Sequence, residues 1–203
     1  MMAAFAQLLR RVEEHLGQQH RYAHSVRVAR CAELLAQRHG GDAGKARLAG
    51  LLHDLARLYS PERLLAESAA RGIAIDAGER AHPTLLHAKL GAAIAREAFG
   101  VQDAGVLSAI EKHTTGAGEM SKLDCIVYLA DSLEPNRTFA ERATLWTLAM
   151  NDLDAAMRGV LRATMEHYAR KGTRPVAATL AAAARFGVSA FGLPEPEISA
   201  SAS

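Results

Sequence analysis

The stretch Leu48-Ala-Gly-Leu-Leu-His-Asp-Leu-Ala-Arg57 places an adjacent histidine and aspartate, His53 and Asp54, at the end of an apolar run. Leucine and alanine favour a helix, and no apolar/polar alternation marks a strand here. A single His-Asp pair is weak evidence for a site, because short motifs recur by chance and a histidine on an apolar helix is more often a core residue. The neighbouring helices therefore decide whether this pair carries chemistry.

The rest of the chain has the same helical character. Leu, Ala, Arg and Glu dominate its 203 residues and β-branched residues are scattered, which predicts an all-α fold, a single-domain helical bundle. Ser60-Pro61, the stretch Ser121–Asp124 and a capping box at Thr138–Glu141 mark helix starts. Glycine and proline mark the stops. The expected helices are 3–16, 19–39, 43–57, 61–71, 83–99, 103–113, 121–133, 138–171 and 173–187.

No linker divides the chain, so residues 1–192 are expected to form one helical domain. Its core would span about 19–137, with C-terminal helices over 138–187. The part from Thr138 onward carries no motif, and we expect it to pack against the core. The final stretch, 193–203, is rich in Pro, Ser and Ala and reads as a disordered tail.

Composition and charge exclude several classes of protein. The net charge is +2, from 24 Lys and Arg against 22 Asp and Glu, so no basic field indicates a nucleic-acid duplex as partner. No apolar run reaches the ~18 residues of a membrane span, and no membrane partner is expected. Cys31 and Cys125 lack any CxxC spacing, which argues against a zinc ribbon and fits a reducing cytoplasm.

Further imidazoles and a carboxylate lie on or beside other apolar helices. His24 precedes the His-Asp pair by one helix, His87 and His113 follow it, and Asp131 ends the run Ile126–Asp131. Helical bundles assemble metal sites from facing helices in this way. The metal ligands expected from this pattern are His24, His53, Asp54, His87, His113 and Asp131.

This set of ligands predicts two metal ions. Imidazole and carboxylate together suit iron, manganese or another divalent transition metal, and six ligands exceed the needs of one tetrahedral zinc. An adjacent histidine and aspartate can serve two ions when the carboxylate bridges them, so Asp54 and His53 are the expected catalytic residues. His82, next to Pro83, stays open as an alternative ligand to His87.

The pattern resembles a known family. The matching segments are Arg21–Ser25, Leu51–Ala56, His87–Ala92, His113-Thr-Thr-Gly116 followed by Met120-Ser121, and Tyr128–Pro135 with Arg137. They are similar to the HD-domain phosphohydrolases and, more narrowly, to the symmetrical diadenosine tetraphosphate (Ap4A) hydrolases of bacteria. Two details depart from that pattern: Arg57 stands where many members have lysine, and His87-Ala-Lys89 stands where His-Gly-Pro is common.

The resemblance implies a mechanism and a metal. It implies one metal held by His24, His53, Asp54 and Asp131, and another held by Asp54, His87 and His113. The family metal is iron, with manganese or another divalent metal as alternatives. Water or hydroxide held by the metal pair would attack an inner phosphorus of Ap4A and give two ADP. The implied partner is a dinucleoside polyphosphate or another nucleotide, and a homodimer stays open.

Polar residues near the motifs are candidates for substrate binding. Hydroxyl and amide groups at a helix end can meet an anion, and guanidinium forks suit phosphate oxygens. Glu134 would orient a ligand histidine or bind ribose. The competing interpretations are an ordinary glycine helix stop and solvated surface charges. The candidates are Arg21, Arg57, Lys89, Thr114, Thr115, Gly116, Glu134 and Arg137.

Three other functions are compatible with the same motifs. An HD nucleotidase or phosphodiesterase acting on other nucleotides would share every metal ligand. An HD-type di-iron oxygenase would use the same set, although nothing indicates an oxidisable substrate. A non-catalytic nucleotide-binding HD module would have no need of six intact ligands.

Overall fold

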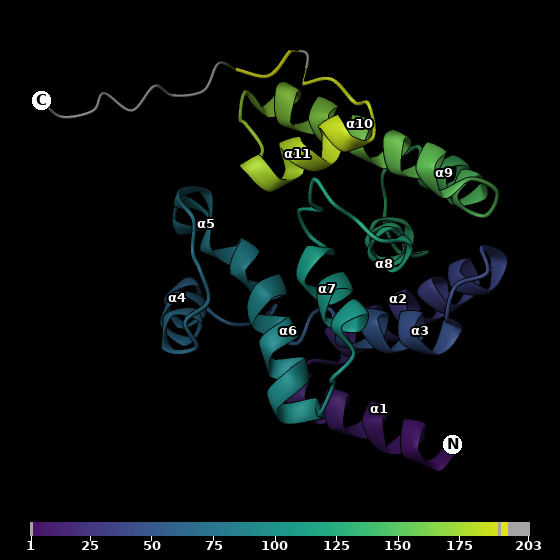
Figure 1. Ribbon diagram of the computed structural model, residues 1–203, viewed down its shortest axis with the longest axis vertical. Coiled ribbons are helices and arrows are strands. Elements are labelled where there is room, and N and C mark those ends of the chain that lie inside the picture. Colours follow the sequence, from purple (N-terminus) through teal and green to yellow (C-terminus); the bar gives the residue numbers. More distant parts are fainter. Residues whose placement is uncertain (1, 191, 195–203) are drawn as a thin grey trace, which may run out of the picture.

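The computed structural model describes residues 2–190 and 192–194, and every regular element in them is helical (Figure 1). The all-α prediction is confirmed. The elements are α1 (Met2–Leu16), α2 (Gln19–Arg38), α3 (Ala43–Leu52), α4 (Pro61–Ala70), α5 (Ala77–Ala81), the 3-10 turn η1 (Pro83–Leu85), α6 (Leu86–Phe99), α7 (Ala104–Lys112), α8 (Lys122–Leu133), α9 (Arg142–Ala149), α10 (Leu153–Lys171) and α11 (Ala177–Arg185). No described helix is long and apolar enough to cross a membrane.

The helices bury two apolar clusters. One is built by α1, α3, α4, α6 and α7, with Leu51 and Ile110 fully buried; the other by α8 to α11, with Leu129 and Leu161 fully buried. Helices α2, α3 and α8 contribute to both clusters. Figure 1 shows α9, α10 and α11 at one end of the molecule and α1 at the other. The chain between these ends is where the histidines come together.

A glycine allows α3 to pack closely on α2. A Cβ atom on Gly50 would lie 2.9 Å from Cα of Ala29, nearer than side chains tolerate. Only a residue without a side chain fits there. This close approach brings the end of α3, which carries His53, next to His24 on α2.

Two predicted helix starts are confirmed. The Ser60 side chain accepts from the backbone N–H of Arg63, with Pro61 in the first helical position. Ser121 and Asp124 form a reciprocal capping box at the start of α8. These are the caps that satisfy free N–H groups at a helix N-terminus.

The predicted helix over 43–57 is wrong at its C-terminal end. Helix α3 stops at Leu52, and the following residues form tight turns in which Arg57 N–H donates to the Asp54 carbonyl at 2.9 Å. The backbone therefore changes direction after Leu52, and the side chains of His53 and Asp54 are buried in the interior. The short helix α5 went unpredicted, although Asp76 and Glu79 form a capping box at its start.

The single helix expected over 138–171 is two helices. Helix α9 ends at Ala149, and Asp152 caps the start of α10, where its side chain accepts a hydrogen bond from Ala155 N–H at 2.9 Å. The capping box at Thr138–Glu141 is also wrong, since α9 begins at Arg142 without a side-chain cap. The predicted helix 83–99 opens with the 3-10 turn η1, and 173–187 shortens to α11. Of the predicted tail, 195–203 lies outside the described residues.

Candidate metal centre

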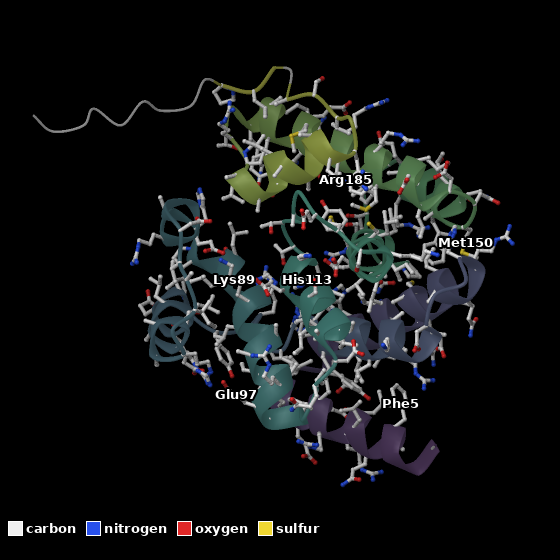
Figure 2. The ribbon with its side chains drawn as sticks, viewed as in Figure 1. Phe5, Lys89, Glu97, His113, Met150 and Arg185 are labelled. Atoms are coloured by element: carbon white, nitrogen blue, oxygen red, sulfur yellow. The ribbon has the colours of Figure 1, made fainter. Side chains whose placement is uncertain are left out.

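Four buried imidazoles converge from separate elements. His24 lies on α2 and His87 on α6, while His53 and His113 directly follow α3 and α7. Figure 2 labels His113 at the end of α7, near the middle of the molecule. The Nε2 atoms of His24 and His53 are 3.2 Å apart, and those of His87 and His113 are also 3.2 Å apart. The histidines thus form two pairs.

The backbone fixes which nitrogen of three of these rings carries the proton. Nδ1 of His53 donates to the Gly50 carbonyl and Nδ1 of His113 donates to that of Ile110, both at 2.7 Å. His87 bonds the carbonyl three residues before it in the same way. In the neutral ring these bonds place the proton on Nδ1 and aim Nε2 at the centre, which is how metal-binding histidines are oriented.

Asp54 lies between the two pairs and gives one oxygen to each. Its Oδ2 is 3.7 Å from Nε2 of His24 and 3.4 Å from that of His53. Its Oδ1 is 3.4 Å from Nε2 of His87 and 3.8 Å from that of His113. We call the His24–His53 side the first half-site and the His87–His113 side the second half-site. A carboxylate in this position can bridge two ions.

Asp131 adds a second carboxylate to the first half-site. Its Oδ1 is 3.1 Å from Nε2 of His24 and 3.7 Å from Nε2 of His53. Arg137 bonds the Asp131 carboxylate, and its Nε donates to the Asp131 carbonyl at 2.8 Å. The six predicted ligands are therefore brought together around one point.

The electrostatics keep the carboxylates ionised. Burial works to raise the pKa of Asp54, but the neighbouring His53 and the hydrogen bonds outweigh it and hold that pKa well below its usual range. Burial likewise opposes charge on His53, whose pKa is nevertheless raised by Asp54. Burial, with His53 and His87 beside it, lowers the pKa of His113 to about 3. A neutral imidazole beside an ionised carboxylate is what metal binding requires.

The residues fit a pair of divalent metal ions. The ligand atoms of His24, His53 and Asp131 lie within 4.8 Å of one another, as do those of His53, Asp54 and His113. In each imidazole pair two Nε2 acceptors face each other at hydrogen-bond distance, and a cation between them would satisfy both. The mixture of imidazole and carboxylate suits iron, manganese and related ions.

The choice between His82 and His87 is settled by position. His82 is exposed at the end of α5, whereas His87 is buried and touches Asp54 and His113. Between the two stands η1, which turns the chain before α6 begins. His87 is the member of the cluster.

A cavity of about 270 Å³, here called the central cavity, opens onto the metal centre. Four of the eight predicted substrate residues line it: Arg21, Arg57, Thr114 and Arg137. Arg21 donates to Oδ2 of Asp54 at 2.8 Å, and the Thr114 hydroxyl lies 2.9 Å from Nε2 of His113. The cavity therefore combines three guanidinium groups with the second half-site.

Three other predicted substrate residues lie away from this cavity. Lys89 follows His87 by two positions, about 200° around a helix, and its Nζ pairs with Glu79 at 2.7 Å. The Thr115 hydroxyl donates to the Gly116 carbonyl at 3.0 Å. Gly116 has φ +65°, and a Cβ there would lie 2.8 Å from Cβ of Ala182 on α11. Thr115 and Gly116 therefore belong to a turn that packs against α11.

Glu134 is buried and contacts a histidine of the first half-site. Only 2% of it is exposed; it lies 3.2 Å from Nδ1 of His24 and accepts from Nε of Arg27 at 2.6 Å. These contacts favour the orienting role over ribose binding. Burial opposes its charge, yet the bond from Arg27 lowers its pKa. Arg27 was missed, although it follows His24 by three residues and so shares its helix face.

Residues of the C-terminal helices line a cavity beside the metal site. A second cavity, of about 370 Å³, shares Asp131 and Arg137 with the metal site and is lined on its other side by Phe139 and by His167 of α10. Neither residue belongs to a metal-binding motif, so the sequence alone does not predict this cavity. The chain after Thr138 packs against the core as expected, through contacts of α9 and α10 with α8.

Comparisons with known proteins agree with these motifs. The family model described as "HD domain" matches residues 21–136. A protein of Halalkalibacterium halodurans named symmetrical bis(5'-nucleosyl)-tetraphosphatase is 37% identical over 80% of this chain and 86% of its own length. A Bacillus subtilis protein of the same name is 36% identical over 75% and 82%.

A solved structure shares the fold. It is described as an HD superfamily hydrolase involved in NAD metabolism, from Clostridium acetobutylicum; it has a TM-score of 0.85 and 32% identity, covering 90% of this chain and 96% of that one. The family match spans all six residues of the candidate metal centre. The chain therefore belongs to the HD domain family and is a hydrolase of that family, related over most of its length to the symmetrical bis(5'-nucleosyl)-tetraphosphatases.

Proposed function

We propose that this protein hydrolyses dinucleoside tetraphosphates symmetrically, with Ap4A as the reference substrate and two ADP as products. One observation carries the proposal: Asp54 presents one oxygen to each imidazole pair, beside a cavity lined by three arginines. The names of the curated relatives support the same reaction. The substrate class follows from the arginines, which suit a polyphosphate, and from those relatives.

The metal ligands would be the six residues of the two half-sites, with Asp54 shared. Divalent ions bound there supply a water of lowered pKa and positive charge beside the phosphoryl oxygens. Iron is the metal we favour, with manganese as the alternative. The chain's own contribution is to hold the imidazoles in one tautomer and to keep water from their buried faces.

The arginines would position the phosphate chain. Arg21 and Arg137 already hold Asp54 and Asp131, and a guanidinium has further N–H groups for phosphate oxygens. Nε of Arg21 is buried and has no hydrogen-bond partner among the described residues. Arg57 is exposed at the rim of the central cavity. Together they would neutralise charge that develops on the phosphoryl oxygens.

The reaction breaks one P–O bond of the oxygen bridge that joins the two inner phosphorus atoms. Water adds its oxygen to one inner phosphorus, the bridging oxygen leaves with the other, and the released proton completes two ADP molecules. Each ADP carries two phosphates, so the cut is symmetrical. Cleavage at any other bridge gives ATP and AMP or adenosine tetraphosphate and adenosine.

The test uses purified protein loaded anaerobically with Fe(II), or with Mn(II), and given Ap4A in water enriched in oxygen-18. ADP as the sole product, with label in the β-phosphate of half of it, supports the proposal. ATP with AMP contradicts symmetrical cleavage, and no turnover with either metal contradicts the activity. Faster turnover of mononucleotides or cyclic nucleotides than of Ap4A favours the nucleotidase alternative.

A further inference from the structure

The Phe139 cavity is the 370 Å³ hollow bounded by Asp131 and Arg137 on one side and by α10 on the other. It adjoins the central cavity, because those two residues line both. Its volume lies in the range of small-molecule binding sites. A molecule that occupied the central cavity could therefore extend into it.

The lining of the Phe139 cavity differs from that of the central cavity. Phe139, Val160 and Ala163 give it an apolar wall, and Glu141 and Glu166 add carboxylates. Arg170, which lies 3.9 Å from Glu166, also lines it, together with His167 and the shared Arg137. The central cavity has three arginines but neither a phenyl ring nor a glutamate. Carboxylates repel phosphate but accept hydrogen bonds from hydroxyl groups, and an apolar wall suits an aromatic base. The expected occupant is a nucleoside rather than a phosphate.

Phe139 is unusual among the described residues because it is a large aromatic side chain that is exposed, to 37%. The other exposed large apolar side chains of the described chain are two leucines. Folding gains nothing from leaving an aromatic ring in water. Its loop is held in place, since Arg137 bonds Asp131 and Arg142 donates to the Leu133 carbonyl at 3.1 Å. The loop that carries Phe139 is thus anchored beside the metal centre.

We propose that the Phe139 cavity is a nucleoside subsite, in which Phe139 stacks on the base and the carboxylates face the ribose hydroxyls. The inference rests on the proposed function and names the part of the chain that recognises the nucleoside. Another cavity, of about 760 Å³ and lined by Tyr168, meets the central cavity at Thr84 and Leu85. It leaves room for a second nucleoside on the side of the second half-site.

The test compares Phe139→Ala, Phe139→Trp and the control Leu34→Ala, which shortens an exposed apolar side chain far from the site on α2. All are loaded with Mn(II). Phe139→Ala is expected to raise KM for Ap4A at least about fivefold with kcat little changed, because stacking holds substrate and transition state equally. Phe139→Trp should restore KM, and Leu34→Ala should leave it unchanged.

Inorganic tetraphosphate, which has no nucleoside, separates base recognition from damage to the phosphate site. Its inhibition constant should be the same in Phe139→Ala and the parent protein. An unchanged KM for Ap4A overturns the inference, and so does an equal rise of KM and of that inhibition constant. If the parent protein does not cleave Ap4A, the proposed function fails, and titration with ADP against pyrophosphate then tests the subsite: only ADP binding should weaken in Phe139→Ala.

Discussion

The two half-sites share Asp54 and differ in what surrounds them. The first half-site has a second carboxylate, Asp131, and its His24 is braced by Glu134. The second half-site has its two imidazoles, one oxygen of Asp54 and the Thr114 hydroxyl. The first half-site is therefore richer in negative charge.

The second half-site, which has less negative charge, is the more open of the two to the central cavity. Both imidazoles of the second half-site, His87 and His113, line the central cavity with the three arginines. The first half-site reaches this cavity only through its carboxylates, Asp131 and the shared Asp54, and its imidazoles do not line it. A cation gains more from two carboxylates than from one, so the first half-site should bind its metal more tightly. An open coordination position is what a catalytic metal needs for water or substrate. The comparison indicates that the first half-site mainly binds its metal tightly and that the second half-site exposes its metal to water and substrate. The following predictions test that division.

Asp54→Ala should have the largest effect, because it removes a ligand from both half-sites. We expect fewer than two metal ions per chain and a loss of activity of more than about 10³-fold, since even a single oxyanion donor contributes about 10²–10³. Metal analysis and Ap4A turnover measure both. Asp42→Ala, which removes the exposed cap of α3, is the matched control and should keep both metals. Full metal content in Asp54→Ala would refute the bridging role.

His87→Ala should empty only the second half-site. The first half-site retains His24, His53, Asp131 and one oxygen of Asp54, so we expect one metal per chain and a loss of activity of about 10²-fold or more. His82→Ala is the control for metal content and should retain two ions. Two ions in His87→Ala, or none, would contradict independent half-sites.

Glu134→Gln should weaken the first half-site alone. The substitution keeps the shape of the side chain but removes the charge that orients and polarises His24. Loss of such a partner typically costs about 10- to 100-fold in metal affinity. Competition with a chelator resolves the two binding steps. Glu33→Gln, which alters a partly exposed pair with Arg47, should change neither step. Equal weakening of both steps would mean that Glu134 acts on the fold and not on His24.

The six residues of the candidate metal centre could be found from the sequence because they belong to five motifs, each on or directly after a different helix. The same holds for helix starts at Ser60 and Ser121, where a cap is a local signal. The end of α3 could not be predicted, since Leu48–Arg57 keeps a helical composition while the structure turns at His53 to bring it to the cluster. Tertiary packing outweighs local propensity there.

The residues of the second cavity could not be predicted for a different reason. Phe139 and His167 belong to no metal-binding motif; Phe139 lies in the loop after α8, and the packing of α10 beside α8 brings His167 to the cavity that Asp131 lines. Arg27 could have been found by reading the helix face of His24, three residues earlier. Lys89 shows the converse: it is two residues from His87 in sequence, but its side chain pairs with Glu79 and does not line the central cavity.

Lys89→Met should have the smallest effect and tests that last point on one helix. Lys89 and His87 are two positions apart on α6, yet Lys89 bonds Glu79 and the Ala74 carbonyl on the far side from the metal centre. We expect kcat/KM for Ap4A to stay within about twofold of the parent value. Because a partly exposed ion pair is worth about 1 kcal/mol or less, Tm should fall by no more than about 2–4 °C. A large rise in KM would instead place Lys89 on the substrate and show that the central cavity extends around α6.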